Sequence, residues 1–346
     1  MIQKSLSLLL LITIFASCST SQTYINKEDG NPLILTPPQE KDLIYQVFLI
    51  GDAGAPSLDV QEPTLKLFQQ KLDDAGERSA AIFLGDNIYM IGLPDSTHPR
   101  RAFYEQRIIE QLKTVENYKG RIVFVPGNHD WDDGGPAGLE AVNRQEQFVE
   151  SYLNRGNTFV PDNGFPGPIS IKLLDDNDDP RLREDIRLIV LDTQWWLHKY
   201  DKPYGDTGEY ELFDAGDVLI QLDDILKKQR NDNLLIAAHH PLRTNGNHGG
   251  YLPPSTHLKP PLFGSLYALY RRVFGFPQDV HHHQYAKMVD ALENLFDAYE
   301  LEDLIYASGH AHSLQYHREE GTRINHHYLI SGAGSKENWV ASGRGS

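Results

Sequence analysis

Five short segments rich in glycine, aspartate, asparagine and histidine each follow directly on an apolar run of this sequence. They are, in chain order, Gly51-Asp52-Ala53-Gly54, Gly85-Asp86-Asn87-Ile88-Tyr89, Gly127-Asn128-His129-Asp130, His239-His240-Pro241 and Gly309-His310-Ala311-His312. A short apolar run that stops at a tight turn is typical of a buried strand. Five such segments in this order indicate strand ends that deliver carboxylate, amide and imidazole groups to one place. That combination predicts a site for two metal ions, of the kind that hydrolyses phosphate esters.

The first half of the chain alternates predicted strands with predicted helices. The predicted strands cover residues 43–50, 80–84 and 121–125, and the predicted helices cover residues 63–74, 103–115 and 139–153. Strand, loop and helix repeated three times favour an α/β sandwich with buried sheets. Each motif then falls at the carboxyl end of a strand, which is where open α/β sheets bind their ligands.

The second half predicts fewer helices and more strands. Residues 169–174 and 186–191 predict a hairpin across the acidic loop 175–179, for which a solvated turn and a calcium site both stay open. Further strands are predicted over residues 234–238, 304–306 and 328–330, and helices over residues 219–226 and 285–299.

A segment rich in proline and aromatic residues, at about 251–284, reads as an insertion. Three interpretations stay open for it. It could be a lid whose aromatic side chains select the substrate, namely Tyr267, Tyr270, Phe274 and Phe276. It could lie at a membrane surface, helped by Arg271 and Arg272. It could also be an extra packed hairpin of helices.

Composition and charge narrow the class of protein. The chain has 346 residues, of which 40% are hydrophobic, so it can bury a large core. Its formal net charge is −16, and a surface of that sign repels nucleic acid phosphates. We therefore expect no nucleic acid binding. A phosphorylated small-molecule substrate is still compatible, because bound cations invert the field locally.

The N-terminus has the features of an export signal. Lys4 is followed by an apolar stretch at residues 8–15, which is too short for a membrane span. The only cysteine is Cys18, and Phe15-Ala16-Ser17-Cys18 resembles a bacterial lipobox, in which the cysteine is lipidated after cleavage. An ordinary cleaved signal with an incidental cysteine is the alternative. The resemblance implies a signal peptide over residues 1–17, a tether over 18–41, and a lipid anchor in the bacterial cell envelope, in the periplasm or at the cell surface.

The residue types in the five motifs suit two adjacent metal ions. Such a pair needs a bridging group, usually a carboxylate, and Asp86 is placed for it because it follows a buried run and a tight turn. Asp52 can act as a terminal ligand, and Asn128 offers a neutral oxygen. The imidazole ligands would be His239, His310 and His312. The last two are two residues apart, so they converge only from extended or irregular backbone.

The order and spacing of these motifs, from Gly51 to Gly334, resemble the calcineurin-like metallophosphoesterase superfamily. The resemblance implies a four-layer α/β-β/α sandwich over residues 42–346. Within the superfamily, the tyrosine at Tyr89 and the glycine at Gly54 are similar to the purple acid phosphatase branch, which includes the tartrate-resistant acid phosphatases. Most members have a histidine ligand where Gly54 stands, and the tyrosine takes its coordination position.

This resemblance implies a ligand set for each ion. The first ion would take Asp52, Asp86, Tyr89 and His312, and the second Asp86, Asn128, His239 and His310. A phenolate is a hard anionic ligand and favours Fe(III) at the first site, whereas the second accepts Fe(II), Zn(II) or Mn(II). The implied reaction is phosphomonoester hydrolysis by a metal-bound hydroxide.

The resemblance also implies roles beside the ligands. His129 would protonate the leaving oxygen or steady the transition state, and Asp130 would orient that imidazole. Candidate substrate contacts are Asn87, His240 and His248. Two other functions stay open: a phosphodiesterase acting on nucleotides or lipid head groups, and a metal-stabilised binding lipoprotein of a surface complex.

One feature departs from the purple acid phosphatase branch. There, several further strands follow the Gly-Ala-Gly segment and complete the second sheet, whereas only residues 335–346 follow it in this sequence. Either the last strands are missing from a trimmed piece of a longer chain, or the sheet edge is finished differently.

Overall fold

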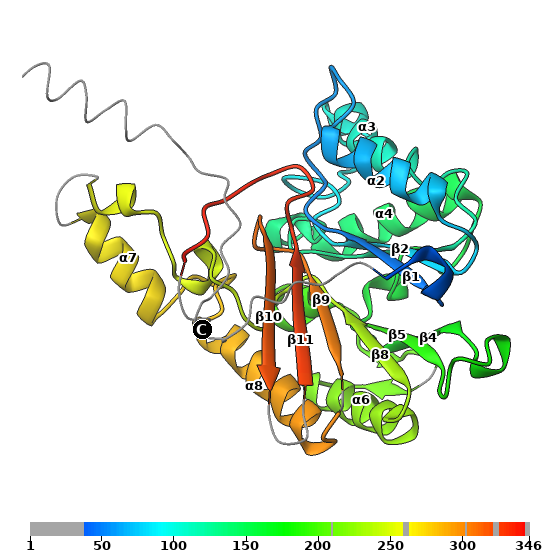
Figure 1. The fold of residues 1–346 in the computed structure, drawn as a ribbon. Helices are drawn as coiled ribbons and strands as arrows, with labels where there is room; N and C mark the ends of the chain where they lie inside the picture. Colours follow the sequence, from blue (N-terminus) through cyan, green and yellow to red (C-terminus); the bar gives the residue numbers. More distant parts are fainter. Residues whose placement is uncertain (1–37, 209, 259–262, 302, 321–324, 343–346) are drawn as a thin grey trace, which may run out of the picture. The chain divides into compact units, whose positions relative to one another are not determined.

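The computed structural model describes residues 38–208, 210–258, 263–301, 303–320 and 325–342 (Figure 1). Residues Pro38–Ala341 pack as one unit, and the description that follows is of that unit. The signal, Cys18 and most of the tether lie outside the described residues, so export and lipidation stay predictions. No helix within the described ranges has both the length and the apolar character needed to cross a membrane.

The first sheet has three parallel strands in the order β1-β2-β3. Its strands are β1 (Gln46–Ile50), β2 (Ser79–Leu84) and β3 (Arg121–Val125), and its helices are α2 (Pro63–Asp74), α3 (Arg101–Leu112) and α4 (Gly138–Leu153). All six were predicted, with boundaries that differ by up to three residues. Pro63 begins α2, where its missing N–H costs no hydrogen bond.

The second sheet has six strands in the order β10-β11-β9-β8-β5-β4. The predicted hairpin is present as β4 (Ile169–Leu174) and β5 (Ile186–Val190). Three further strands run parallel to β5, namely β8 (Asn233–Ala237), β9 (Ile305–Ser308) and β11 (Asn325–Ser331). An unpredicted strand, β10 (Leu314–Glu320), pairs antiparallel with β11 and forms one edge.

Alternation of side chains along the strands produces the layers. Ala80, Ile82 and Leu84 of β2 cluster with residues of β5, β8 and β9, such as Val190, so the two sheets face each other across an apolar core. The intervening Phe83 belongs to the other cluster, with the apolar faces of the helices. Figure 1 shows α2, α3 and α4 beyond the first sheet, and α6 (Ala215–Gln229) and α8 (His283–Ala298) beyond the second. This confirms the predicted α/β-β/α sandwich.

The remaining elements are short. They are α5 (Thr193–Leu197), α7 (Phe263–Val273), β6 (Gly205–Asp206), β7 (Glu211–Leu212), η2 (Glu40–Asp42), η3 (Asp132–Gly134), η4 (Asp162–Gly164), η5 (Asp176–Asp178), η6 (Asn247–Gly249) and η7 (Pro254–Leu258). In the acidic loop, Lys172 Nζ lies 2.6 Å from Asp175 and 2.8 Å from Asp185. Asp185 also pairs with Arg187 at 2.6 Å, so two cationic side chains already balance Asp175 and Asp185, which favours the solvated turn over a calcium site among Asp175, Asp176 and Asp185.

The insertion is less buried than a packed hairpin would be. Helix α7 buries only Gly264 and Ala268 among its residues. The aromatic side chains proposed to select the substrate are 42–63% exposed, and they are Tyr267, Tyr270, Phe274 and Phe276. The far end of the insertion also contacts histidines of the predicted ligand set, as described below.

Candidate metal centre

The five motifs follow β1, β2, β3, β8 and β9, so they meet at one edge of the two facing sheets. Three of the predicted ligands have left-handed backbone at the turn out of the strand: Asp52 at φ 57°, Asp86 at φ 53° and His310 at φ 64°. Such backbone is unfavourable for residues other than glycine and concentrates at functional sites. The turns are held across the sheets, since His310 N donates to Asp52 Oδ2 at 2.7 Å.

The first predicted ligand group converges closely. Tyr89 Oη lies 2.8 Å from Asp52 Oδ1 and 2.9 Å from His312 Nε2. His312 Nε2 also lies 3.4 Å from Asp52 Oδ1. Ligands that bind one metal at about 2.1 Å and at right angles lie about 3 Å apart, so this spacing suits a shared ion.

The second predicted group converges in the same way. Asn128 Oδ1 lies 3.1 Å from both His239 Nε2 and His310 Nδ1, and these two nitrogens are 3.2 Å apart. Asp86 Oδ1 lies 3.4 Å from His239 Nε2. Asp86 also interacts with Tyr89 of the first group, so its carboxylate stands between the two groups. The structure thus brings all seven predicted ligands together.

Hydrogen bonds to main-chain carbonyls fix which ring nitrogen of His239 and of His310 faces the site. His239 Nδ1 lies 2.8 Å from Leu84 O, and His310 Nε2 lies 2.8 Å from Gln278 O. Only a protonated nitrogen bonds a carbonyl, so His239 Nε2 and His310 Nδ1 carry lone pairs. Asn128 Oδ1 faces both, because its Nδ2 donates to Asp133 Oδ1 at 3.3 Å. With both rings neutral, three buried acceptors face each other and repel unless a cation lies between them, so the residues fit a metal ion.

The protonation states agree with this fit. Burial opposes ionisation of Asp86, but the positive charge of a protonated His239 or His129 and the hydrogen bond from His129 N hold its pKa below the usual range, and a bound cation beside a neutral His239 would act in the same direction. Burial, followed by the neighbouring histidines, lowers the pKa of His310 well below its usual value. An ionised carboxylate and neutral imidazoles are the forms that bind metals. Burial and then Asp52 and Asp86 raise the pKa of Tyr89 well above 10, so its phenol keeps a proton that only a strongly charged cation would displace.

The role expected for Asp130 is wrong. Its fully buried carboxylate accepts hydrogen bonds from Gly127 N at 2.8 Å, Asn87 N at 3.0 Å and Ile88 N at 3.1 Å. It therefore ties the β2 and β3 turns together rather than orienting an imidazole. His129 Nδ1 instead lies 2.7 Å from Met90 O and 3.3 Å from Asp133 Oδ1, so the main chain and a different carboxylate orient this imidazole. Its Nε2 lies 3.9 Å from Asp86 Oδ2, facing the ligands.

Asn87 is also corrected, from substrate contact to positioning residue. It is 1% exposed, and its Nδ2 donates to Val125 O at 2.9 Å and to Asp130 Oδ2 at 3.0 Å. The same turns explain Gly54. A Cβ at Gly54 would lie 2.5 Å from Asp86 O, so the close approach of the two loops excludes any side chain there.

The two remaining candidate substrate contacts differ. His240 is fully buried, with Nδ1 2.8 Å from Thr193 Oγ1 and Nε2 2.7 Å from Gln278 Oε1. Both ring nitrogens are engaged, so the prediction that it contacts substrate is wrong. His248 packs its ring on His310 with centroids 4.0 Å apart, and its side chain is 21% exposed. It stays a candidate.

Several residues that the sequence did not indicate support the site. Asp279 Oδ1 lies 3.1 Å from His248 Nδ1, and Gln278 contacts His240 and His310 as described, so the end of the insertion braces three histidines. Lys336 Nζ lies 3.1 Å from the centre of the Tyr89 ring. Burial lowers the pKa of Lys336, and the neighbouring Asp86 and Asp52 offset this only in part. In the sequence, only the position of Lys336 two residues after the Gly-Ala-Gly segment could have indicated that it lies near the site.

Comparison with known proteins gives one family. The model for calcineurin-like phosphoesterases matches residues 45–314. No curated protein matches the chain. Among solved structures, the chain is similar to GAP50, the anchor in the inner membrane complex of Plasmodium, with 16% identity, a TM-score of 0.46, and coverage of 86% of this chain and 75% of that one. It is also similar to PhoD, with 12% identity, a TM-score of 0.47, and coverage of 84% and 56%.

Proposed function

The chain belongs to the calcineurin-like phosphoesterase family, whose members hydrolyse phosphoric esters, and we propose that it is a binuclear-metal phosphomonoesterase most like the purple acid phosphatases. One observation carries the proposal. Asn128 Oδ1, His239 Nε2 and His310 Nδ1 face each other at 3.1–3.2 Å as buried acceptors, beside a second group that shares Asp86.

The chain's own residues define where the ions would be held. The first would lie among Asp52, Asp86, Tyr89 and His312, and the second among Asp86, Asn128, His239 and His310. When bound, the ions would supply positive charge for the phosphate oxygens and acidify the attacking water. The phenol of Tyr89 favours Fe(III) in the first group, with Fe(II), Zn(II) or Mn(II) in the second.

Two cationic side chains would act on the ester itself. When protonated, His129 donates Nδ1–H to Met90 O and directs Nε2–H toward the ligands, where it can protonate the leaving oxygen. Lys336 lies over the Tyr89 ring and can contact a phosphate oxygen. A monoester dianion carries one more negative charge than a diester, so this extra cation favours the monoester.

The test is phosphate release from a generic monoester and a generic diester, measured side by side. Protein lacking residues 1–18 would be loaded with iron plus zinc or manganese. Turnover that is faster with the monoester supports the proposal. A preference for the diester would move the assignment to a phosphodiesterase. No turnover of either, with both metals bound in full, would favour a binding protein.

Replacing Lys336 with methionine is expected to lower kcat/KM for a monoester about tenfold and for a diester by less than about twofold. The reason is that a charge-assisted contact to the additional phosphate charge is lost. Steady-state kinetics on both esters checks this. Lys336→Arg keeps the charge and should retain most of the activity. An equal loss on both esters would mean that Lys336 only packs against Tyr89.

Replacing Tyr89 with phenylalanine is expected to remove the violet Fe(III) absorption while sparing much of the activity, because the phenolate is the source of the colour and only one of four ligands. The visible spectrum of iron-loaded protein measures this. Tyr118→Phe is a matched control, since Tyr118 bonds Ser79 rather than the ligands. An unchanged spectrum in Tyr89→Phe would show that the tyrosine does not bind the metal.

A further inference from the structure

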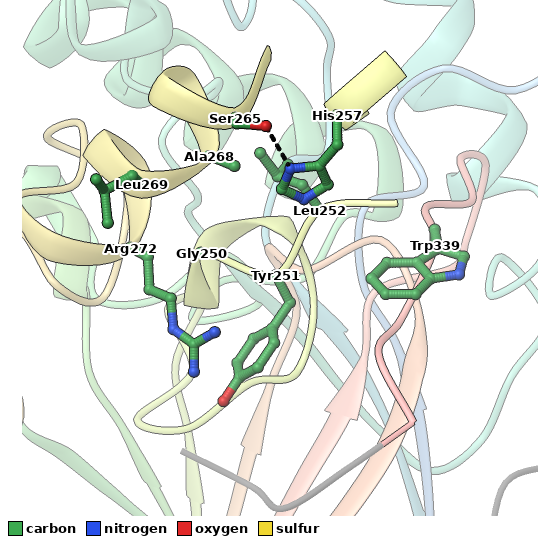
Figure 2. Close-up of a pocket in the computed structure, with 9 residues that line it drawn as sticks. All are labelled: Gly250, Tyr251, Leu252, His257, Ser265, Ala268, Leu269, Arg272 and Trp339. Carbon is green, nitrogen blue, oxygen red and sulfur yellow. Dashed lines mark hydrogen bonds between the residues drawn. The ribbon is translucent and has the colours of Figure 1, made fainter. Parts of the chain in front are cut away.

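A cavity of about 350 Å³ lies between the insertion and the C-terminal segment. Figure 2 shows Trp339 across from helix α7, with Gly250 and Tyr251 between them. Leu252 and Leu269 add apolar side chains to the wall, and His257, whose Nδ1 lies 3.1 Å from Ser265 Oγ, adds a polar one. None of the described side chains that line it is a carboxylate. Its volume is in the range of pockets that hold small organic molecules.

Two chain segments connect this cavity to the metal centre. Gly250 comes two residues after His248, whose ring packs on His310 with centroids 4.0 Å apart. Trp339 directly follows Asn338, whose backbone N donates to His312 O at 2.7 Å and whose side-chain amide lies 2.9 Å from His312 Nδ1. The cavity walls are therefore continuous with residues that touch two predicted ligands.

A third contact joins the two chain segments to each other. Ala341 N donates to Asn245 O at 2.9 Å, which fastens the C-terminal segment to the loop that carries His248. Two of the lining residues therefore lie within two positions of His248 and Asn338, which contact the predicted ligands His310 and His312. Most of the exposed aromatic side chains of α7 point elsewhere, since the cavity is lined from this helix by Ser265, Ala268, Leu269 and Arg272.

We propose that this cavity binds the organic group of the ester, and that the preferred group is flat and apolar, such as an aromatic ring system. The proposal rests on the phosphomonoesterase function above. Trp339 and Tyr251 offer aromatic faces, on which a ring gains both buried apolar area and stacking. Arg272 lies over the Tyr251 ring at 5.3 Å, so the one charged lining group is itself stacked. A small alkyl group such as methyl would leave these faces uncovered.

The experiment compares 2-naphthyl phosphate with methyl phosphate in the metal-loaded protein. Trp339→Ala removes one wall and is expected to lower kcat/KM about tenfold for the naphthyl ester and less than about twofold for the methyl ester. Ser265→Phe fills the cavity from α7 and should give the same selective loss. Phe274→Ala is the matched control, because Phe274 is 63% exposed and does not line the cavity. Comparing each variant with the parent on the same ester cancels the difference in leaving-group reactivity.

Failure of this inference and failure of the proposed function give different results. Equal losses on both esters, or no loss on either, would overturn the cavity assignment while leaving the phosphatase intact. If no ester is hydrolysed, the proposed function fails, and binding is then read by quenching of tryptophan fluorescence with a naphthyl phosphonate. Quenching that is lost in Trp339→Phe would keep the cavity as a binding site, and quenching unchanged in that variant would reject it.

Discussion

Replacing Asp86 with alanine is expected to reduce phosphate release to below about 1% of the parent. Asp86 Oδ1 lies 3.4 Å from His239 Nε2 and accepts a hydrogen bond from His129 N at 2.9 Å, while the carboxylate also interacts with Tyr89. It is the one carboxylate in the described site that both ligand groups share. Without it, Asp52 is the only carboxylate left among the predicted ligands of two cations, so at least one ion should be lost.

Metal content and turnover should be measured on the same preparations of Asp86→Ala. Asp178→Ala is a suitable control, because this aspartate lies in the solvated acidic loop. Thermal unfolding shows whether the variant folds. Residual turnover above a few per cent in folded Asp86→Ala protein would contradict the two-metal assignment. Folded protein that binds both ions yet is inactive would assign Asp86 to positioning the reaction rather than holding metal.

The convergence of the proposed ligands was predictable, because it depends on residue type and on strand position. Buried strands flanked on both faces give continuous apolar runs, so β2 and β3 and the turns after them stand out in the sequence. Strand β10 was missed because it is an edge strand with the polar sequence LQYHREE, which shows no apolar run.

The supporting contacts were not predictable, for two reasons. The main-chain carbonyls of Leu84 and Gln278 determine which ring nitrogen of His239 and His310 is protonated. Every residue has a main-chain carbonyl, so the sequence does not show which one makes such a contact. Asp279 reaches His248 from 31 positions away, through an insertion with no strand-end motif of its own. Adjacency was also misleading for Asp130, since its side chain turns away from His129 toward the neighbouring loop.

Replacing Asp130 with alanine is expected to lower the free energy of unfolding by about 3 kcal/mol or more, because several buried N–H groups would lose their acceptor. Those groups belong to Gly127, Asn87 and Ile88, which flank two predicted ligands. Thermal or denaturant unfolding of the metal-free protein measures the loss. Asp130→Asn should be intermediate, because it keeps one acceptor oxygen but turns an NH₂ toward other donors.

Activity separates the positioning role of Asp130 from a role in proton transfer. A carboxylate that only holds the turns should, when replaced by asparagine, weaken metal affinity and lower kcat without moving the pH profile. The reason is that His129 Nδ1 contacts Met90 O and Asp133 Oδ1 rather than Asp130. A carboxylate that tuned His129 would instead shift the pH profile by about one unit or more with stability retained. That result would reinstate the orienting role that the sequence suggested, and it would require His129 to turn toward Asp130 in the metal-loaded protein.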